Sequence, residues 1–157
     1  MSPSAAPTDD AATRSWLSVV RAYHLCSELI AQRLAAVGVK TSEHEILVNL
    51  RRQPGLSQQA LAARCFTAKS HISGLLGDLE ARGWIRRSPD PADGRVKRLS
   101  LTEAGAEVAE RTAAVQAEVV QLMTQGVPLA ELQQVDRSMG EVISRLETAL
   151  RGTPEAR

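Results

Sequence analysis

The stretch DGRVKRLSLTEAG, residues 93–105, decides the fold of this chain. Gly94 ends a turn, the residues after it alternate in polarity as a strand does, and Thr102 is placed to cap a helix. The stretch therefore predicts one arm of a β-hairpin with Arg95 at its tip, followed directly by a helix. A hairpin of this kind beside a helix-turn-helix is typical of a nucleic-acid-binding wing.

The residues before the hairpin predict that helix-turn-helix. A short helix opens at Ser57 as its N-cap and ends near Arg64, and Thr67 is a plausible N-cap for the next helix. The buried face of that second helix is predicted to consist of four apolar residues, Ile72, Leu75, Leu76 and Leu79. Its first turn would then face solvent, where a recognition helix meets base edges.

The hairpin itself is predicted from two alternating segments, 84–87 and 96–101, joined by a turn over 88–94. Pro89 and Pro91 in this turn keep the tip from extending the sheet. The chain is rich in alanine and leucine and poor in aromatic residues, so most of it should be helical. The predicted fold is mainly α: a winged helix-turn-helix with a two- or three-stranded β-wing.

Helices are also predicted on both sides of this region. Apolar residues recur at helical spacing from Trp16 to about Ala36, and a Ser42-x-x-Glu45 capping box precedes a further helix. Two C-terminal helices follow, separated by the breaker Gly126-Val127-Pro128. We therefore divide the chain into a disordered tail (1–12), an N-terminal dimerisation helix (13–40), a winged helix-turn-helix region (41–102), C-terminal dimerisation helices (103–151) and a tail (152–157).

The outer helices predict a homodimer. One small winged core cannot bury the apolar faces of both the first and the last helices, so a second copy is expected to cover them. An intramolecular bundle is the alternative. A dimer would place two recognition helices about one turn of DNA apart.

The distribution of charge supports a polyanion partner, although the net charge of the chain is only +1. From Ser57 to Thr102 there are eight basic and four acidic residues, whereas the remainder carries an excess of acid. The basic excess coincides with the predicted helix-turn-helix and wing, which favours contact with phosphate. A merely solvated charged face is the alternative.

Several classes of protein find no support in the sequence. There is no nucleophile-base-acid set, no phosphate-binding glycine loop and no metal-ligand spacing, so we expect neither an enzyme nor a cofactor or metal site. No stretch approaches a membrane span and the N-terminus lacks the apolar core of a signal peptide, which predicts a cytoplasmic protein.

Three blocks in order, LEARGWIRR (79–87), DPADGR (90–95) and LSLTEAG (99–105), carry a more specific signal. With this spacing the chain resembles the MarR family of bacterial transcriptional regulators from Trp16 to Leu150. The resemblance implies a homodimeric winged helix-turn-helix protein that binds a palindromic operator in double-stranded DNA, typically as a repressor released by a small aromatic or anionic ligand or by an oxidant.

The resemblance also implies roles for particular residues. Arg95 matches the wing arginine that enters the minor groove, and Asp93 matches the acid that orients it by an ion pair. The same two residues could instead only staple the wing. The predicted DNA-contacting set is Ser57, Gln58, Thr67, Lys69, Ser70, His71, Ser73, Asp93, Arg95 and Lys97. Gly74 and Asp78 stand where relatives often carry basic residues. The wing is therefore expected to make a larger share of the contacts with DNA.

The predicted helix-turn-helix and wing together form the reading head of the protein. An effector site is expected where the first, second and fifth helices meet this reading head. The candidates for a hydrophobic anion or a phenol are Trp16, Tyr23, His24, His44 and Arg52. The aromatic residues could equally be dimer core, and the histidines could be satisfied surface or interface groups.

Two further functions stay open at this stage. A thiol-based switch would use Cys26 or Cys65, although Cys26 does not align with the reactive cysteine of the family's peroxide sensors. A protein of another class, an interaction adaptor whose winged domain no longer binds DNA, would differ by showing no steep salt dependence.

Overall fold

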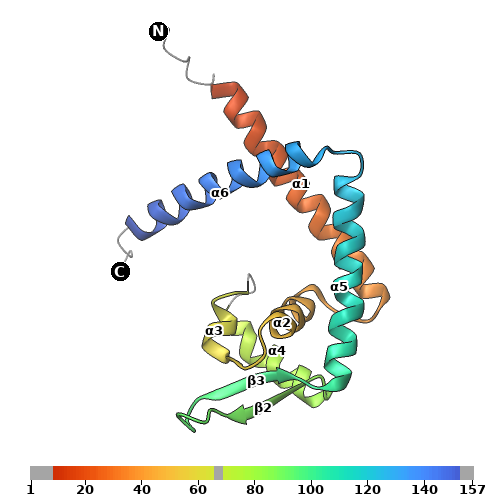
Figure 1. The fold of residues 1–157 in the computed structure, drawn as a ribbon, viewed down its shortest axis with the longest axis vertical. Coiled ribbons are helices and arrows are strands. Elements are labelled where there is room, and N and C mark those ends of the chain that lie inside the picture. The colour runs from red at the N-terminus through yellow and green to blue at the C-terminus, as the bar shows by residue number, and fades with distance from the viewer. Residues whose placement is uncertain (1–8, 66–68, 153–157) are drawn as a thin grey trace. The chain divides into compact units, whose positions relative to one another are not determined.

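The computed structural model describes residues 9–65 and 69–152 of the 157-residue chain. The chain divides into two compact units, Met1–Val119 and Val120–Arg157. Figure 1 labels the helices and the strands β2 and β3. In chain order the elements are α1 (Asp9–Ala36), α2 (Thr41–Arg52), β1 (Leu56–Ser57), α3 (Gln58–Ala62), α4 (Lys69–Ala81), β2 (Ile85–Pro89), β3 (Lys97–Leu101), α5 (Glu103–Thr124) and α6 (Leu129–Gly152).

The first helix begins earlier than its apolar pattern predicts. α1 starts at Asp9, so residues 9–12 are helical although the sequence assigns them to a disordered tail. Acidic residues are favourable beside the positive end of a helix dipole, and Asp10 also pairs with Arg14 one turn later. The expected end at Ala36 is confirmed, and Gly38 follows with φ of +74°.

The capping box predicted from Ser42 and Glu45 is wrong. α2 begins at Thr41 with Lys40 as its N-cap, and the Glu43 carboxylate accepts a hydrogen bond from the Lys40 backbone N–H at 2.9 Å. Glu43 is buried and lies three residues after the cap, a position from which its carboxylate reaches back to the cap N–H. A shift of two residues in the helix start explains the error, because helix boundaries depend on tertiary contacts as well as on local signals.

The wing is a three-stranded antiparallel sheet in the order β1-β3-β2. β2 pairs with β3 from Ile85 opposite Leu101 to Pro89 opposite Lys97, and Leu56 in β1 pairs with Leu99. Pro89 is therefore the last residue of a strand and not part of the turn. Because β1 lies directly before α3, the central strand β3 ties the wing to the helix-turn-helix.

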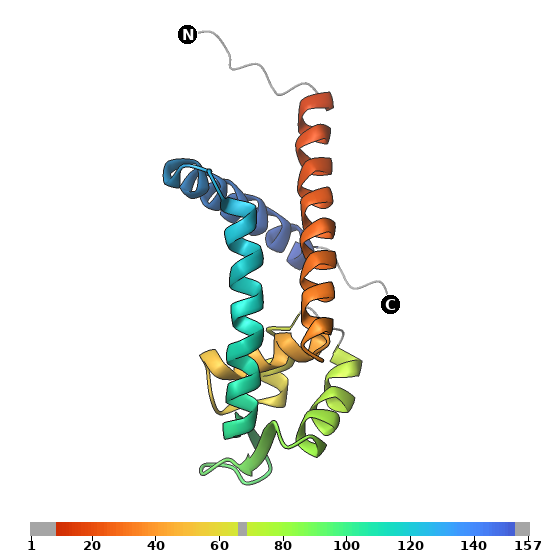
Figure 2. The ribbon, with the colours of Figure 1, turned by 90° about the vertical axis from the view of Figure 1, so that its right-hand side faces the viewer.

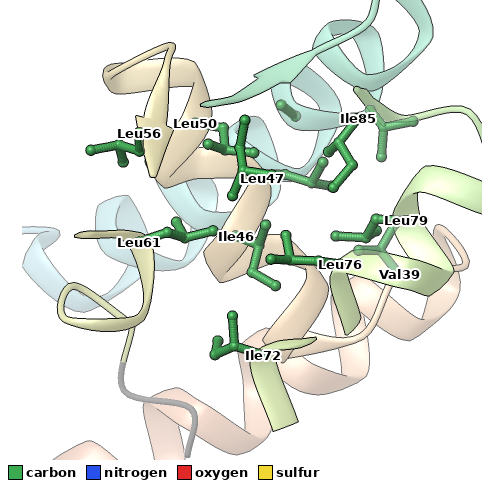
Figure 3. Packing of buried hydrophobic residues seen from close by; sticks show 13 residues of the cluster. Val39, Ile46, Leu47, Leu50, Leu56, Leu61, Ile72, Leu76, Leu79 and Ile85 are labelled. Atoms are coloured by element: carbon green, nitrogen blue, oxygen red, sulfur yellow. The ribbon is translucent and has the colours of Figure 1, made fainter. Parts of the chain in front are cut away.

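The core of the first unit lies between α2, α3, α4 and the base of the sheet (Figure 3). Ile46, Leu47 and Leu50 on one face of α2 are completely buried. They meet buried residues from the other elements, namely Leu61, Ile72, Leu76, Leu79, Ile85 and Leu99. Each such side chain contributes about 2 kcal/mol by leaving water, so this core favours the folded state of the reading head.

A tight joint connects α4, β2 and α5. Gly83, with φ of +70°, ends α4, since the left-handed conformation lets the Trp84 N–H return to the carbonyl of Leu79 at 2.9 Å. Thr102 caps α5 as predicted, because its hydroxyl accepts from the Gly105 N–H at 3.0 Å, and the same hydroxyl donates to the carbonyl of Gly83 at 2.6 Å. The carbonyl of Trp84 lies so close to Gly105 that a Cβ there would meet it at 1.7 Å.

Two long helices of the first unit extend from the core. α1 and the first part of α5 leave the reading head on the same side, as Figures 1 and 2 both show, and Arg33 donates to Glu118 at 3.1 Å between them. The outward faces remain apolar, since Trp16, Leu17, Tyr23 and Leu25 of α1 are all more than half exposed. In the second unit, every residue of α6 is at least partly exposed.

Candidate nucleic-acid interface

The first turns of α4 face solvent, as the apolar pattern predicts. Ile72, Leu76 and Leu79 are fully buried, and Leu75 is half-buried against the same core. Ser70, His71, Ser73 and Gly74 are exposed on the other side. Lys69 is the first residue of α4, and the predicted N-cap Thr67 lies outside the described residues. The described part of this surface offers hydroxyl and imidazole groups.

The start of α3 is held by its own cap. The Ala60 N–H donates to the hydroxyl of Ser57 at 3.1 Å, which confirms the predicted N-cap, and Ser57 is half-buried. Gln58, the next residue, is exposed. Of these two candidate phosphate contacts, Gln58 has the side chain that no described bond engages, whereas the Ser57 hydroxyl already satisfies a helix terminus.

The tip of the wing is organised by Asp90, a residue that the sequence reasoning missed. Asp90 is only 7% exposed, and its carboxylate accepts from the backbone N–H of Ala92 at 2.7 Å and of Asp93 at 3.1 Å. Its other oxygen accepts from Nε of Arg98. The backbone bond from Ala92 is the largest of the effects that lower the pKa of Asp90, followed by Arg98. The signal in the sequence is an aspartate that opens the loop, a position typical of an Asx turn.

Arg98 ties this loop to the helix-turn-helix. Its second nitrogen, Nη1, donates to the carbonyl of Gly55 at 3.0 Å, and the Gly55 N–H donates to the carbonyl of Leu99 at 2.8 Å. Gly55 lies in the turn between α2 and β1. The hairpin is therefore fixed at its base to the element that leads into α3, so the direction of the wing relative to α3 is set by the fold.

Asp93 acts on Arg95 in a different way from the one predicted. The Asp93 carboxylate accepts from the backbone N–H of Arg95 at 3.0 Å, and the described residues include no ion pair between the two side chains. A carboxylate two residues upstream is well placed for a backbone N–H, whereas a long guanidinium at a loop tip projects outward. Arg95 is exposed, and so is Lys97 at the start of β3.

Not all of the basic excess is available to a partner. Arg82 pairs with Glu43, Arg87 with Glu80 and Arg98 with Asp90. Of the basic residues between Ser57 and Thr102 whose side chains the structure describes, the remaining four are exposed and form no ion pair there: Arg64, Arg86, Arg95 and Lys97. Three of these four lie on the hairpin, and Arg64 lies just after α3.

The five candidate effector residues do not form one cluster. Trp16, Tyr23 and His24 lie on the exposed surface of α1, where the rings of Tyr23 and His24 meet edge to face at 5.8 Å. Arg52 is exposed at the end of α2, whereas His44 is 6% exposed. Burial lowers the pKa of His44, although a hydrogen bond with Gln116 of α5 opposes the shift, and Nδ1 of His44 has no hydrogen-bond partner in the described structure.

A groove of about 390 Å³ lies elsewhere in the first unit. It is lined by residues of α2, α4 and their flanking turns, namely Gly38, Lys40, Glu43, Asp78, Ala81 and Arg82. None of the five candidate effector residues lines it. The groove instead borders the ion pair between Glu43 and Arg82, which is 3.1 Å long.

Of the two candidate redox thiols, Cys65 lies in an environment that disfavours a redox switch. Cys65 is half-buried, and burial raises its pKa from 9.0 to about 11, with a smaller effect of Glu45 in the same direction. A thiol needs to ionise to react with an oxidant, so this environment makes Cys65 less reactive than an ordinary cysteine. Cys26 is a half-buried free thiol in α1. The described residues contain no group of three or more potential metal ligands.

Comparison with known proteins relates the reading head to a family. The family model described as "MarR family" matches residues 37–96, which include α2, α3, α4 and β2. This segment of the chain is similar to the MarR family. An HTH-type transcriptional regulator of Bacillus cereus is 30% identical over 96 residues, which are 61% of this chain and 63% of that protein. The chain thus spans less than two thirds of the length of this relative.

Other relatives extend the similarity along the chain. The transcriptional repressor MprA of Escherichia coli K12 is 26% identical over 129 residues, or 79% of this chain and 73% of that protein. Among solved structures, the MarR-family regulator AbsC of Streptomyces coelicolor has a TM-score of 0.76 and 24% identity, covering 94% of this chain and 99% of AbsC.

A MarR mutant of E. coli bound to operator DNA has a TM-score of 0.72 and 17% identity, covering 87% and 99% of the two chains. These structures share the winged-helix fold of the MarR family with this chain. Separately, no helix in the described ranges combines the length and the apolar character needed to cross a membrane.

Proposed function

We propose that this protein is a DNA-binding transcriptional regulator that acts as a homodimer on a palindromic operator. The observation that carries the proposal is the wing. An exposed Arg95, which forms no ion pair with any described residue, stands at the tip of a loop that Asp90 and Arg98 hold to the helix-turn-helix. An arginine in such a place fits a narrow, electronegative minor groove. The exposed turns of α4, with Ser70, His71 and Ser73, would then enter the adjacent major groove.

The homodimer is supported by the apolar surfaces of the outer helices. Monomeric proteins seldom leave large contiguous apolar patches in water. Here the exposed apolar residues of α1 and α6 include Trp16, Leu17, Leu25, Leu129, Val135, Ile143, Leu146 and Leu150. A second copy that buries these side chains would place two reading heads on one side of the DNA, as a palindromic site requires.

Repression with release by a small ligand is the mode of regulation that we propose. The name of the similar MprA protein, a transcriptional repressor, supports the first part. For the second part, the buried Nδ1 of His44 lacks a hydrogen-bond partner among the described residues, and a buried polar atom of this kind favours a polar ligand beside it. The ligand must prefer the conformation that does not bind DNA, since equal affinity for both conformations would shift nothing.

A mobility-shift assay tests the proposal. The purified full chain is mixed with the roughly 200 base pairs upstream of its own gene at near-physiological salt, with excess non-specific DNA. We expect a discrete shift that is weakened about tenfold or more by Arg95→Ala, together with a decrease of about one in the slope of log affinity against log salt. Arg111→Ala, an exposed arginine of α5, is the control and should bind as the wild type does.

The possible results separate regulator from adaptor. Salt-sensitive binding that depends on Arg95 supports a wing that contacts DNA. Absence of binding to this DNA and to random duplexes at micromolar protein would contradict the proposal, and would favour an interaction adaptor.

A further inference from the structure

Arg82 occupies the point at which the two candidate DNA-contacting elements diverge. It lies directly after α4 and before Gly83, whose left-handed backbone turns the chain toward β2. The Arg82 N–H donates to the carbonyl of Asp78 at 3.0 Å, and the Gly83 N–H donates to that of Glu80 at 2.9 Å. The backbone at this position is therefore fixed by the end of the helix.

The side chain of Arg82 reaches three other segments from there. One nitrogen, Nη1, donates to Oε1 of Glu43 in α2 at 3.1 Å, and the other, Nη2, lies 3.4 Å from the carbonyl of Gly38 in the turn between α1 and α2. The guanidinium also lies over the ring of Trp84, at 3.5 Å from its centroid, which is a cation-π contact. A single side chain thus joins α4, α2, the α1–α2 turn and the residue that leads into the wing.

The burial of Glu43 makes its ion pair with Arg82 costly to lose. The Glu43 side chain is only 6% exposed, and its second oxygen already accepts from the Lys40 N–H at 2.9 Å. Removing the cation from a buried carboxylate is costly in free energy, because water does not readily reach the carboxylate to replace it. The pair between Arg33 and Glu118 has the same length of 3.1 Å and an arginine of nearly equal exposure, 38% against 39%, but its carboxylate is 65% exposed.

Hydrogen bonds and one ion pair connect the end of α4, where Arg82 lies, to the strands of the wing. The carbonyl of Trp84 accepts from the N–H of Thr102 at 3.0 Å, and the hydroxyl of Thr102 donates to the carbonyl of Gly83 at 2.6 Å. Arg87 of β2 pairs with Glu80 of α4 at 3.4 Å. If the end of α4 rotated about the contacts of Arg82, β2 and β3 would therefore move with it relative to α2.

We propose that Arg82 is a positioning residue for DNA recognition: by holding Glu43, Gly38 and Trp84 together it sets the direction of α4 and of the wing relative to α1 and α2, without contacting DNA. This inference rests on the proposed function as a DNA-binding regulator. Arg82 would affect operator affinity through geometry, since a wing and a helix that enter adjacent grooves must keep a fixed separation.

The experiment compares the affinity of full-length variants for the upstream DNA over a range of salt concentrations, well below the unfolding midpoint of each variant. Arg82→Gln should weaken binding about tenfold and leave the salt slope unchanged, because no phosphate contact is lost. Arg82→Lys keeps the charge beside Glu43 without the planar stack on Trp84, so it should restore part of the affinity. The matched control Arg33→Gln should bind within about twofold of the wild type.

A second readout follows the joint without DNA. In a Trp16→Phe background Trp84 is the only tryptophan, and Arg82→Gln should increase the quenching of its fluorescence by acrylamide. If Arg82→Gln does not fold, Arg82→Lys and Glu43→Gln carry the same comparison, and Glu43→Gln should again weaken binding with an unchanged slope.

Each result decides a separate question. A wild type that binds no DNA contradicts the proposed function and the positioning role with it. If the wild type binds and the Arg82 variants bind equally well, the positioning role alone is overturned. A decrease of about one in the salt slope of Arg82→Gln would also overturn it, because Arg82 would then contact phosphate directly.

Discussion

The reading head and the last helix of this protein differ in where their apolar side chains lie: the reading head buries them, and the last helix exposes them. In the reading head, α2, α3, α4 and the base of the sheet enclose a core in which Leu47, Leu61 and Leu76 are fully buried. In α6 the apolar stripe is equally regular, yet Ile143 is 55% exposed and Leu146 is 59% exposed. The first region therefore buries its apolar side chains within one chain, whereas the second leaves an apolar face exposed, which is the face that we propose a second copy covers.

Breaking the apolar face of α6 should have the largest effect. The double substitution Ile143→Glu with Leu146→Glu places charges where the proposed partner copy would pack, and we expect the dimer to weaken by about a thousandfold. Sedimentation velocity at micromolar concentration would then show a monomer with unchanged helix content.

The control for this change places the same charges on the opposite face of α6. Gln134→Glu with Ser144→Glu adds glutamates at exposed polar positions and should leave the assembly unaffected. A dimer that survives in the first variant would show that α6 is not the interface.

A substitution that disturbs packing within the reading head should instead lower the stability of the folded chain. Gly105→Ala introduces a methyl group 1.7 Å from the carbonyl of Trp84, a backbone atom that cannot move aside without distorting the joint. We expect the free energy of unfolding to fall by about 3 kcal/mol in urea titrations.

The matched substitution is Gly77→Ala, in the same region but with open space around its Cβ position. Because alanine favours an exposed helix over glycine, this variant should gain up to about 1 kcal/mol. Equal effects of the two substitutions would mean that the joint between Trp84 and Gly105 is not tight.

The smallest effect concerns the contact between α2 and α5. His44 has a pKa lowered from 6.5 mainly by burial, so the folded state resists a proton that the unfolded chain accepts. Stability due to this group is therefore present above pH 6.5 and is lost as the pH falls from there toward the lowered pKa.

Unfolding by urea at about pH 7.5 and about pH 5.5 would measure this loss. His44→Gln should reduce the difference between the two pH values, and His24→Gln, an exposed histidine of α1, should leave it as it is. An unchanged difference in His44→Gln would assign the pH dependence to other groups.

The parts of this structure that sequence could predict are those with local signals. Ser57 and Thr102 are caps whose partners lie three residues away, and the hairpin and the buried face of α4 follow from periodicity. The family blocks then identify the reading head. The boundaries of α1 and α2 were less predictable, because α1 begins at Asp9 and α2 at Thr41 without a preceding apolar pattern.

The contacts that arrange the candidate site are not local and could not be predicted in this way. Arg98 and Gly55 are 43 residues apart, and Arg82 and Glu43 are 39 residues apart. On sequence grounds alone, any of several acidic residues or backbone carbonyls could have been the partner of either arginine. Only the packing of α2 against α4 and of β1 against β3 selects among them.

The loop at the wing tip has a consequence for the thermodynamics of association. Asp90 accepts two backbone N–H groups, Asp93 accepts a third, and the Asp90 N–H donates to the carbonyl of Val96 at 2.9 Å. The backbone around Arg95 is thus ordered before any partner arrives. Docking would have to immobilise only the arginine side chain, so calorimetry should show a smaller entropic cost for this wing than for one in which Asp90 is replaced by alanine.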